Sequence, residues 1–235
     1  MLCDIHHHIV YGVDDGAKSL DVAKQMLHAA ARQGVGEICC TSHCTPGYRH
    51  FDADAYFRRL EELQSAAEQE GIDIALFPGM EILYTERTLE YLSSGKAFGL
   101  NRSRNVLIEF MPETPFMLIK RAVMDLSNAG YTPVLAHVER YIELTKEEHM
   151  LRVKQDGAKL QMNAKTVLDS AALFGNRWTK RVLKTGLIDL VASDAHNADK
   201  RKCELGDTQK LLEKRLGKER AAIMTSKLPR QLLGR

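Results

Sequence analysis

The sequence predicts an α/β fold in which parallel strands alternate with helices and close into a small barrel. Five times, an amphipathic stretch ends at a glycine and is followed by a short apolar run, a pattern typical of βα units around a parallel sheet. The length of 235 residues is close to that of a single α/β barrel. No stretch rich in Pro, Gly and Ser divides the chain, so we expect one domain over residues 1–235. A doubly wound open sheet gives the same pattern and is the alternative fold.

The helices are predicted from apolar residues at helical spacing and from residues suited to cap them. Leu20, Ala23 and Leu27 form such a stripe after Ser19, a candidate N-cap, and Asp52 can cap the next helix. A helix commonly ends at a glycine in the left-handed conformation. The glycines expected in this position are Gly34, Gly71, Gly130, Gly157 and Gly186.

Seven short apolar runs predict the strands. Because the strands of a parallel barrel all point the same way, their carboxyl ends meet at one face, where the active sites of such folds are found. The runs are residues 2–6, 37–40, 74–77, 106–110, 133–136, 160–162 and 188–192.

Nearly every predicted strand is followed by a side chain that could hold a metal ion; the exception is the sixth, which ends at the neutral Asn163. Alternation along a strand places His6 and His8 on one face and His7 on the other, so that two imidazoles can hold one ion. Charged residues next to buried strands are costly unless they are paired or metal-bound. We therefore expect a polynuclear metal site formed by His6, His8, His43, Glu81, Glu109, His137, Asp194 and His196.

The types of ligand in this set indicate the metal and the chemistry. Imidazoles and carboxylates without a required thiolate suit Mn²⁺, Fe²⁺ or Zn²⁺ better than Ca²⁺. Two or more such ions would generate a hydroxide nucleophile for in-line phosphoryl displacement, although amide or ester hydrolysis uses similar ligands. Arg140, three residues after His137, and Arg201, five after His196, are expected at the same rim. Guanidinium groups bind phosphate as a fork, so the arginines favour a phosphate ester as substrate.

The composition and the cysteines restrict the class of protein. With 44% hydrophobic and 27% charged residues, the chain is not disordered, collagen-like or a coiled coil. No apolar run is long enough for a membrane span, and the first ten residues do not resemble a secretory signal. The five cysteines are odd in number and irregularly spaced, unlike a disulfide framework. We expect a cytoplasmic protein with free thiols.

The charge is concentrated at one end of the chain. Residues 177–235 contain 15 Lys/Arg and 7 Asp/Glu, a net charge of +8 within a chain of net charge +2. This segment is either a solvated helical surface or a docking face for an anionic partner. The low aromatic content, 6% of the chain, argues against nucleic acid as this partner. Residues 204–235 are expected to be helical first and then to fray into a basic tail.

Several strings resemble one superfamily. They are DIHHHIVYGVDDGAKS (residues 4–19), CTSHC, PGMEI, LIEF, LAHVERY and SDAHN, which run in order from residue 4 to about residue 201. Together they resemble the polymerase-and-histidinol-phosphatase (PHP) superfamily and, within it, the CpsB/YwqE-type tyrosine-protein phosphatases of bacterial capsule and exopolysaccharide operons. A DxHxH motif alone would be shared by many metallohydrolases; the combination is specific.

The resemblance implies a distorted (β/α)7 TIM-like barrel with up to three metal ions, usually manganese, with iron, magnesium or zinc as alternatives. It implies phosphotyrosine as the substrate, on the C-terminal tail of a bacterial tyrosine kinase that controls polysaccharide export. Arg140 and Arg201 would hold the phosphate. The three ion sites implied are His6, His8, Glu81 and Asp194; Glu81, Glu109 and His137; and Asp15, His43 and His196.

The chain departs from the family's pattern at three places around these motifs. Val138 stands where Pro is common, Lys165-Thr166 where Gly-Ser is usual, and Lys202-Cys203 where Pro-Pro often follows the arginine. None of these changes removes an implied ligand. We expect them to alter the rim of the pocket and hence the preferred phosphopeptide.

We therefore expect a metal-dependent phosphoric monoester hydrolase that uses a metal-bridged hydroxide on phosphotyrosine. A cysteine-based phosphatase is excluded because no cysteine has an arginine six positions later; Cys44, for example, is followed there by His50. A small-molecule phosphatase resembling histidinol phosphatase is one alternative, and a non-catalytic metal-binding regulator of a kinase is another. A nuclease is a weaker third, since related PHP domains process nucleic acid.

Overall fold

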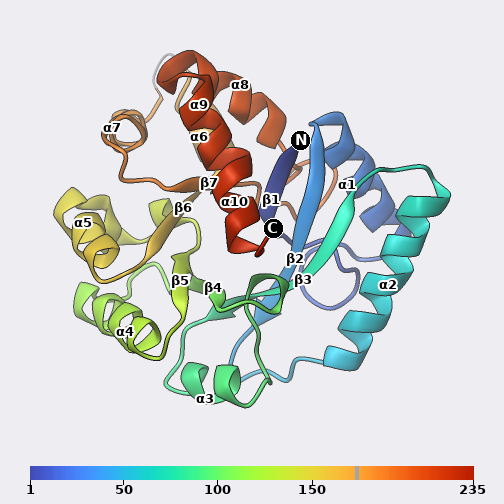
Figure 1. Ribbon diagram of the computed structural model, residues 1–235, viewed down its shortest axis with the longest axis horizontal. Coiled ribbons are helices and arrows are strands. Elements are labelled where there is room, and N and C mark those ends of the chain that lie inside the picture. Colours follow the sequence, from blue (N-terminus) through green and yellow to red (C-terminus); the bar gives the residue numbers. More distant parts are fainter. Residues whose placement is uncertain (173–174) are drawn as a thin grey trace.

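The computed structural model describes residues 1–172 and 175–235 as a nearly closed parallel barrel surrounded by helices (Figure 1). The strands pair in the order β1 to β7, each with its neighbour in sequence. This order confirms the predicted barrel and excludes the doubly wound sheet. The strands are β1 (Leu2–His7), β2 (Val35–Cys44), β3 (Ala75–Leu83), β4 (Asn105–Glu109), β5 (Thr132–Leu135), β6 (Lys159–Asn163) and β7 (Leu190–Ala192).

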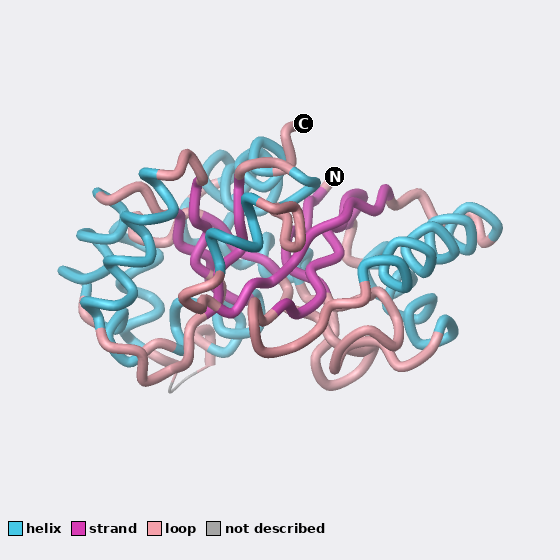
Figure 2. Tube along the Cα trace, turned by 90° about the horizontal axis from the view of Figure 1, so that it is seen from below, coloured by secondary structure: helices cyan, strands magenta, loops and turns pink. Residues whose placement is uncertain are grey.

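Helices cover the outside of the barrel, and the side view shows the strands enclosed between them (Figure 2). In residues 1–172 and 175–235, no helix has both the length and the apolar character needed to cross a membrane. The helices are α1 (Leu20–Arg32), α2 (Ala53–Gln69), α3 (Thr88–Ser93), η1 (Leu100–Arg102), α4 (Phe116–Asn128), η2 (Val138–Arg140), η3 (Ile142–Thr145), α5 (Glu147–Gln155), α6 (Ala164–Asp169), α7 (Arg177–Thr185), α8 (Leu205–Leu216), α9 (Lys218–Ala222), the π-helical η4 (Ile223–Lys227) and α10 (Leu228–Leu232).

The predicted helix ends are confirmed. The Ser19 hydroxyl accepts a hydrogen bond from the Val22 amide at 3.3 Å, and the Asp52 carboxylate accepts one from the Ala55 amide at 3.0 Å. All five glycines predicted to end helices have a positive φ, between 67° and 109°. Local sequence therefore determines where these helices begin and end.

Two strands are longer than predicted, because the pairing between β2 and β3 continues beyond the apolar runs. The predicted runs 37–40 and 74–77 extend to Cys44 and Leu83. Within this extension Thr41 pairs with Gly79 and His43 with Glu81 in register. This pairing brings the polar residues Thr41, Ser42 and His43 into β2. As a result His43 and Glu81 lie side by side on rigid strands.

The prediction that residues 204–235 fray into a basic tail is wrong. The chain stays helical to Leu232 and closes the amino-terminal end of the barrel. Leu232 and Leu233 are 4% and 1% exposed, in an apolar cluster with Ile5. The Asn101 amide donates to the Leu233 carbonyl at 3.0 Å, and the Asn105 amide donates to the Leu232 carbonyl at 2.8 Å. The leucines among the basic residues of this segment, and not its charge, decide its structure.

Leu232→Ala is expected to lower the free energy of unfolding by about 2–5 kcal/mol, since it leaves a cavity in the barrel floor. Denaturant unfolding followed by circular dichroism measures the change. Leu151→Ala, at a half-exposed position of α5, is the matched control and should change stability little. Equal effects of the two substitutions would show that the C-terminal segment does not support the barrel.

Candidate metal centre

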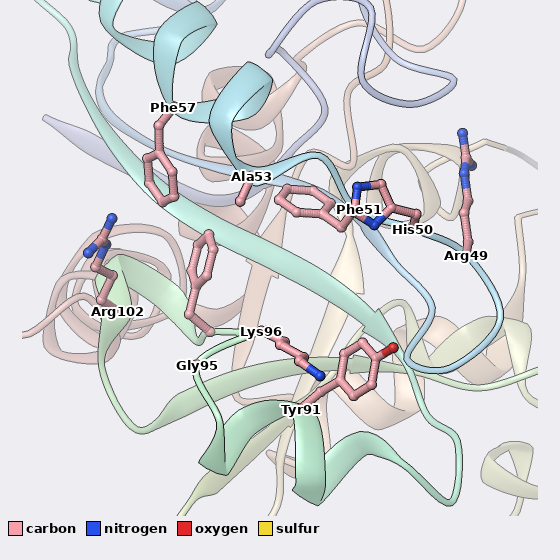
Figure 3. Close-up of a pocket in the computed structure, with 10 residues that line it drawn as sticks. Arg49, His50, Phe51, Ala53, Phe57, Tyr91, Gly95, Lys96 and Arg102 are labelled. Carbon is pink, nitrogen blue, oxygen red and sulfur yellow. The ribbon is translucent and has the colours of Figure 1, made fainter.

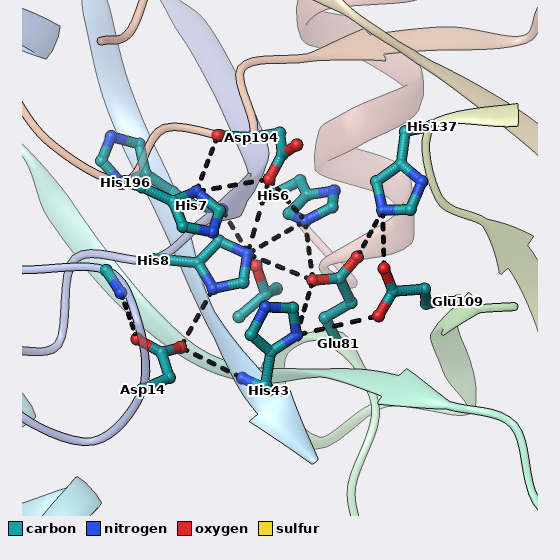
Figure 4. Close-up of polar contacts among 12 residues, drawn as sticks. His6, His7, His8, Asp14, His43, Glu81, Glu109, His137, Asp194 and His196 are labelled. Carbon is teal, nitrogen blue, oxygen red and sulfur yellow. Dashed lines mark hydrogen bonds and ion pairs between the residues drawn. The ribbon is translucent and has the colours of Figure 1, made fainter. Parts of the chain in front are cut away.

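The predicted ligands converge at the carboxyl ends of the strands (Figure 4). His6 lies on β1 and His8 directly follows it, and the side chains from β2, β3 and β4 lie beside them. The structure brings together all nine residues named from the sequence: His6, His8, Asp15, His43, Glu81, Glu109, His137, Asp194 and His196.

Glu81 lies at the centre of the group and is 1% exposed. Its Oε2 is 3.2 Å from Nε2 of His6, 3.2 Å from Nε2 of His8 and 3.1 Å from Nδ1 of His43. Its Oε1 accepts a hydrogen bond from Nε2 of His137 at 2.8 Å. One carboxylate thus faces four imidazoles, a position from which it can bridge two cations.

The geometry fits divalent ions. Buried polar atoms are normally hydrogen-bonded, yet Oε2 of Glu81 has no hydrogen-bond partner within the described residues although three ring nitrogens approach it. Nε2 of His6 and Nε2 of His8 are only 3.2 Å apart. Lone pairs of nitrogen and oxygen atoms therefore converge on shared points, and a cation at those points would satisfy them together.

The ligand atoms fall into overlapping groups in which all atoms lie within 4.8 Å of one another. Asp194 Oδ1 is 3.4 Å from Nε2 of His6 and 3.6 Å from Nε2 of His8, which brings it beside the first predicted ion site. His8 also lies close to the third predicted ion site, formed by Asp15, His43 and His196, and the sequence did not indicate this proximity. The groups at the barrel mouth are His6, His8 and Glu81; His6, His137 and Asp194; His43, Glu81 and Glu109; and His8, Asp15, His43 and His196.

Charge in this group is shared between ionised carboxylates and imidazoles. Burial raises the pKa of Glu81, but the surrounding histidines, His6 first, hold it well below its ordinary value. Burial lowers the pKa of His8, but the hydrogen bond to Asp14 and the adjacent Glu81 carboxylate outweigh this effect and raise the pKa to about 10. A bound cation would take the place of the proton on such an imidazole.

Arg140 and Arg201 lie at the rim, on the side of Asp194 away from the imidazoles. Both guanidinium groups donate to Asp194 Oδ2, Arg201 at 3.0 Å. Their side chains are 41% and 40% exposed, so they remain accessible. A cavity of about 270 Å³ opens here, lined by both arginines together with Lys165 and Lys202. Two of the three departures from the family pattern thus contribute to this rim.

Two of the predicted ligands have strained backbones. His137 and Asp194 have φ of 31° and 54°, in the left-handed region that non-glycine residues avoid. The Gln161 side chain accepts a hydrogen bond from the His137 amide at 2.8 Å, and the Asp194 amide donates to the His6 carbonyl at 2.9 Å. These bonds hold both side chains toward the centre.

Sequence reasoning missed the residues that orient the imidazoles. Asp14 Oδ2 is 3.0 Å from Nδ1 of His8 and accepts from the His43 amide at 3.1 Å. Gln161 Oε1 lies 3.1 Å from Nδ1 of His6. The available signals were an acidic pair, Asp14 and Asp15, and a glutamine inside an apolar strand. Partners of this kind fix the tautomer and direction of a ligand ring.

Asp14→Ala is expected to weaken metal binding and turnover by about 10- to 100-fold while the protein stays folded, since it removes the support of His8. Metal content after dialysis and kcat/KM measure the effect. Asp73→Ala, an exposed loop position, is the control. Unchanged metal affinity in Asp14→Ala would exclude the orienting role.

A parallel barrel with histidines and carboxylates gathered at the carboxyl ends of its strands is the architecture of a metal-dependent hydrolase. The family model described as "Capsular polysaccharide synthesis, CpsB/CapC" matches residues 2–234, and the chain belongs to this family. The resemblance recognised in the motifs is thereby confirmed.

Relatives and solved structures agree with this assignment. The tyrosine-protein phosphatase CpsB of Streptococcus agalactiae serotype III (strain NEM316) is 34% identical over 94% of this chain and 93% of its own length. The tyrosine-protein phosphatase YwqE of Bacillus subtilis (strain 168) is 30% identical over 95% of this chain and 89% of its own length.

A solved structure superposes on this chain with a TM-score of 0.89 at 29% identity, covering 99% of this chain and 94% of that one. It comes from work on YwqE of Bacillus subtilis and CpsB of Streptococcus pneumoniae, which are described there as unique metal-dependent tyrosine phosphatases. An organophosphorus hydrolase from Deinococcus radiodurans shares the fold alone, at a TM-score of 0.62 and 12% identity, over 99% of this chain and 93% of that one.

Proposed function

We propose that this protein is a metal-dependent protein-tyrosine phosphatase. The observation that carries the proposal is the placement of two half-exposed arginines, Arg140 and Arg201, directly beside the histidine–carboxylate cluster and its cavity. The relatives named tyrosine-protein phosphatases, which match nearly the whole chain, support phosphotyrosine as the substrate.

The proposed cofactor is manganese, with up to three ions, and iron, magnesium or zinc would suit the same ligands. His6, His8, Glu81 and Asp194 would hold one ion. Glu81, Glu109 and His137 would hold a second, and Asp15, His43 and His196 a third. When bound, the ions would activate water near neutral pH and offset the charge that develops on phosphorus.

The residues of the chain would bind and orient the phosphate. Each guanidinium can donate two parallel hydrogen bonds to phosphate oxygens, and two such groups fix the ester in one direction. Asp194 Oδ2, to which both arginines donate, holds them in place until the substrate arrives. The leaving phenolate has a pKa of about 10, so it needs little help from an acid.

The proposed substrate protein is a bacterial tyrosine kinase, dephosphorylated on its tail during capsule or exopolysaccharide synthesis. The family's description and the accessible rim support this partner.

We also propose a cytoplasmic location, supported by five buried cysteines that are all free. Because the C-terminal helices pack into the barrel floor, we propose that residues 1–235 act as one catalytic domain.

One observation favours a second candidate. A cavity of about 270 Å³ also suits a small phosphate ester, so a phosphomonoesterase resembling histidinol phosphatase is the alternative. A substrate panel separates the two: protein loaded with Mn²⁺ is offered a phosphotyrosine peptide, histidinol phosphate and single-stranded DNA. We expect the highest kcat/KM on the peptide. Faster hydrolysis of histidinol phosphate or cleavage of DNA would overturn the proposal.

A further inference from the structure

A second and larger cavity, of about 550 Å³, lies outside the metal centre (Figure 3). On one side it is bounded by the loop after β2 and the start of α2, which carry Phe51 and Phe57. On the other side lie α3 and the following segment, with Tyr91, Lys96 and Arg102. We call it the flank groove.

Aromatic rings form the floor and walls of the flank groove. The rings of Phe57 and Phe98 are stacked with centroids 5.5 Å apart, and Phe51 meets Phe98 edge-on at 6.5 Å. These rings and that of Tyr91 are only partly buried. The groove therefore presents aromatic surface that another flat ring could contact.

The rim of the flank groove is cationic. Arg49, Lys96 and Arg102 are exposed, and none of the three forms an ion pair within the described residues. The Arg102 guanidinium lies 4.5 Å from the centroid of the Phe57 ring, and Lys96 Nζ lies 5.5 Å from that of Tyr91. No carboxylate lines the groove among the residues that the structure describes. Its charge is thus complementary to an anion.

We propose that the flank groove binds a second phosphotyrosine of the same substrate chain while the first occupies the metal centre. This inference rests on the proposed function. An aromatic ring that carries a dianion matches both the phenyl walls and the unpaired cations. A nucleotide would also stack, but the lining residues in the described part of the chain include no side-chain amide or carboxylate with which to recognise a base.

The chain connects the flank groove closely to the metal centre. Arg49 follows His43 by six residues, so their Cα atoms are at most about 22 Å apart even if the loop is fully extended. An extended peptide covers that distance in about seven residues. Two phosphotyrosines separated by about seven residues could therefore engage the metal centre and the Arg49 end of the flank groove, and the second contact would raise the effective concentration of the first.

The test compares peptides that carry one or two phosphotyrosines, using the full-length, metal-loaded protein. The variant Arg49→Glu/Lys96→Glu/Arg102→Glu is expected to raise KM for the doubly phosphorylated peptide about tenfold or more, because it replaces three attractive charges by repulsive ones. KM for the singly phosphorylated peptide, and both constants for p-nitrophenyl phosphate, should not change. The double variant Arg49→Glu/Lys96→Glu should show a smaller effect of the same kind, and it leaves the left-handed backbone of Arg102 intact.

The control is Lys180→Glu/Lys184→Glu/Lys214→Glu, which changes net charge equally at exposed positions of α7 and α8. An equal rise of KM in the control, or for the singly phosphorylated peptide, would overturn the proposal, as would tighter binding of AMP than of phosphotyrosine in the groove. Calorimetry with a non-hydrolysable bis-phosphonate peptide keeps the test independent of activity. Lost affinity in the groove variant supports the site even if no peptide is hydrolysed, whereas unchanged affinity contradicts it.

Discussion

Glu81→Gln is expected to lower kcat/KM on a phosphotyrosine peptide by about 10³-fold or more, corresponding to roughly 4 kcal/mol of transition-state stabilisation. Glu81 faces four imidazoles and, among the described carboxylates, it alone belongs to two of the candidate ligand groups, so it is placed to bridge two cations. An amide cannot supply the second anionic oxygen, so fewer ions should be retained as well. Steady-state kinetics and the metal content of the dialysed protein are the measurements.

Glu86→Gln provides the matched control, because Glu86 is exposed and lies a few residues beyond β3. It should retain normal turnover and metal content. If Glu81→Gln also kept full turnover, or lost turnover with a complete set of ions, Glu81 would not be the bridging ligand.

The double variant Arg140→Lys/Arg201→Lys is expected to lower kcat/KM by at least about 10²- to 10³-fold, the usual effect of removing one preorganised donor. Lysine keeps the positive charge but cannot form the planar fork that binds two phosphate oxygens. Metal content should be unchanged, since the arginines contact Asp194 Oδ2 and the imidazoles face Oδ1. This retained metal distinguishes the arginine variant from Glu81→Gln.

Kinetics with p-nitrophenyl phosphate and a phosphotyrosine peptide should show the same loss, because both substrates carry the phosphate that the arginines bind. A loss limited to the peptide would instead place the arginines in contact with the polypeptide. Unchanged kinetics with both substrates would remove Arg140 and Arg201 from the site.

Features of the fold that depend on local sequence could be predicted. The caps at Ser19 and Asp52 and the left-handed glycines follow from side chains within a few residues, and the structure has them. The lengths of β2 and β3 could not be predicted in this way. Thr41 and Ser42, for example, are polar, and they belong to β2 only because they pair with residues of β3. Likewise, the buried position of Leu232 depends on a cluster with residues more than a hundred positions away.

In the candidate metal centre, residue types and their order along the chain indicated the candidate ligands. They did not indicate which neighbouring side chains orient those ligands. Two neighbouring aspartates illustrate the limit. Asp14 is turned inward onto His8, whereas Asp15 is 60% exposed and faces His43 and His196. Side chains alternate between two faces in a strand but not in a loop, so alternation could not predict which of the two aspartates faces His8. The left-handed backbones of His137 and Asp194 also leave no local signal, because hydrogen bonds from distant strands hold them.

Removal and return of the metal is the most direct test of the proposed function. Protein treated with a chelator, dialysed and reloaded with Mn²⁺ is assayed for phosphate release from a phosphotyrosine peptide, with a thiol-alkylated sample in parallel. We predict that hydrolysis disappears with the chelator, returns with Mn²⁺ and survives alkylation, since all five cysteines are buried and none lies in the proposed site. Hydrolysis that is indifferent to the chelator, or that is lost on alkylation alone, would contradict a metal-dependent phosphatase.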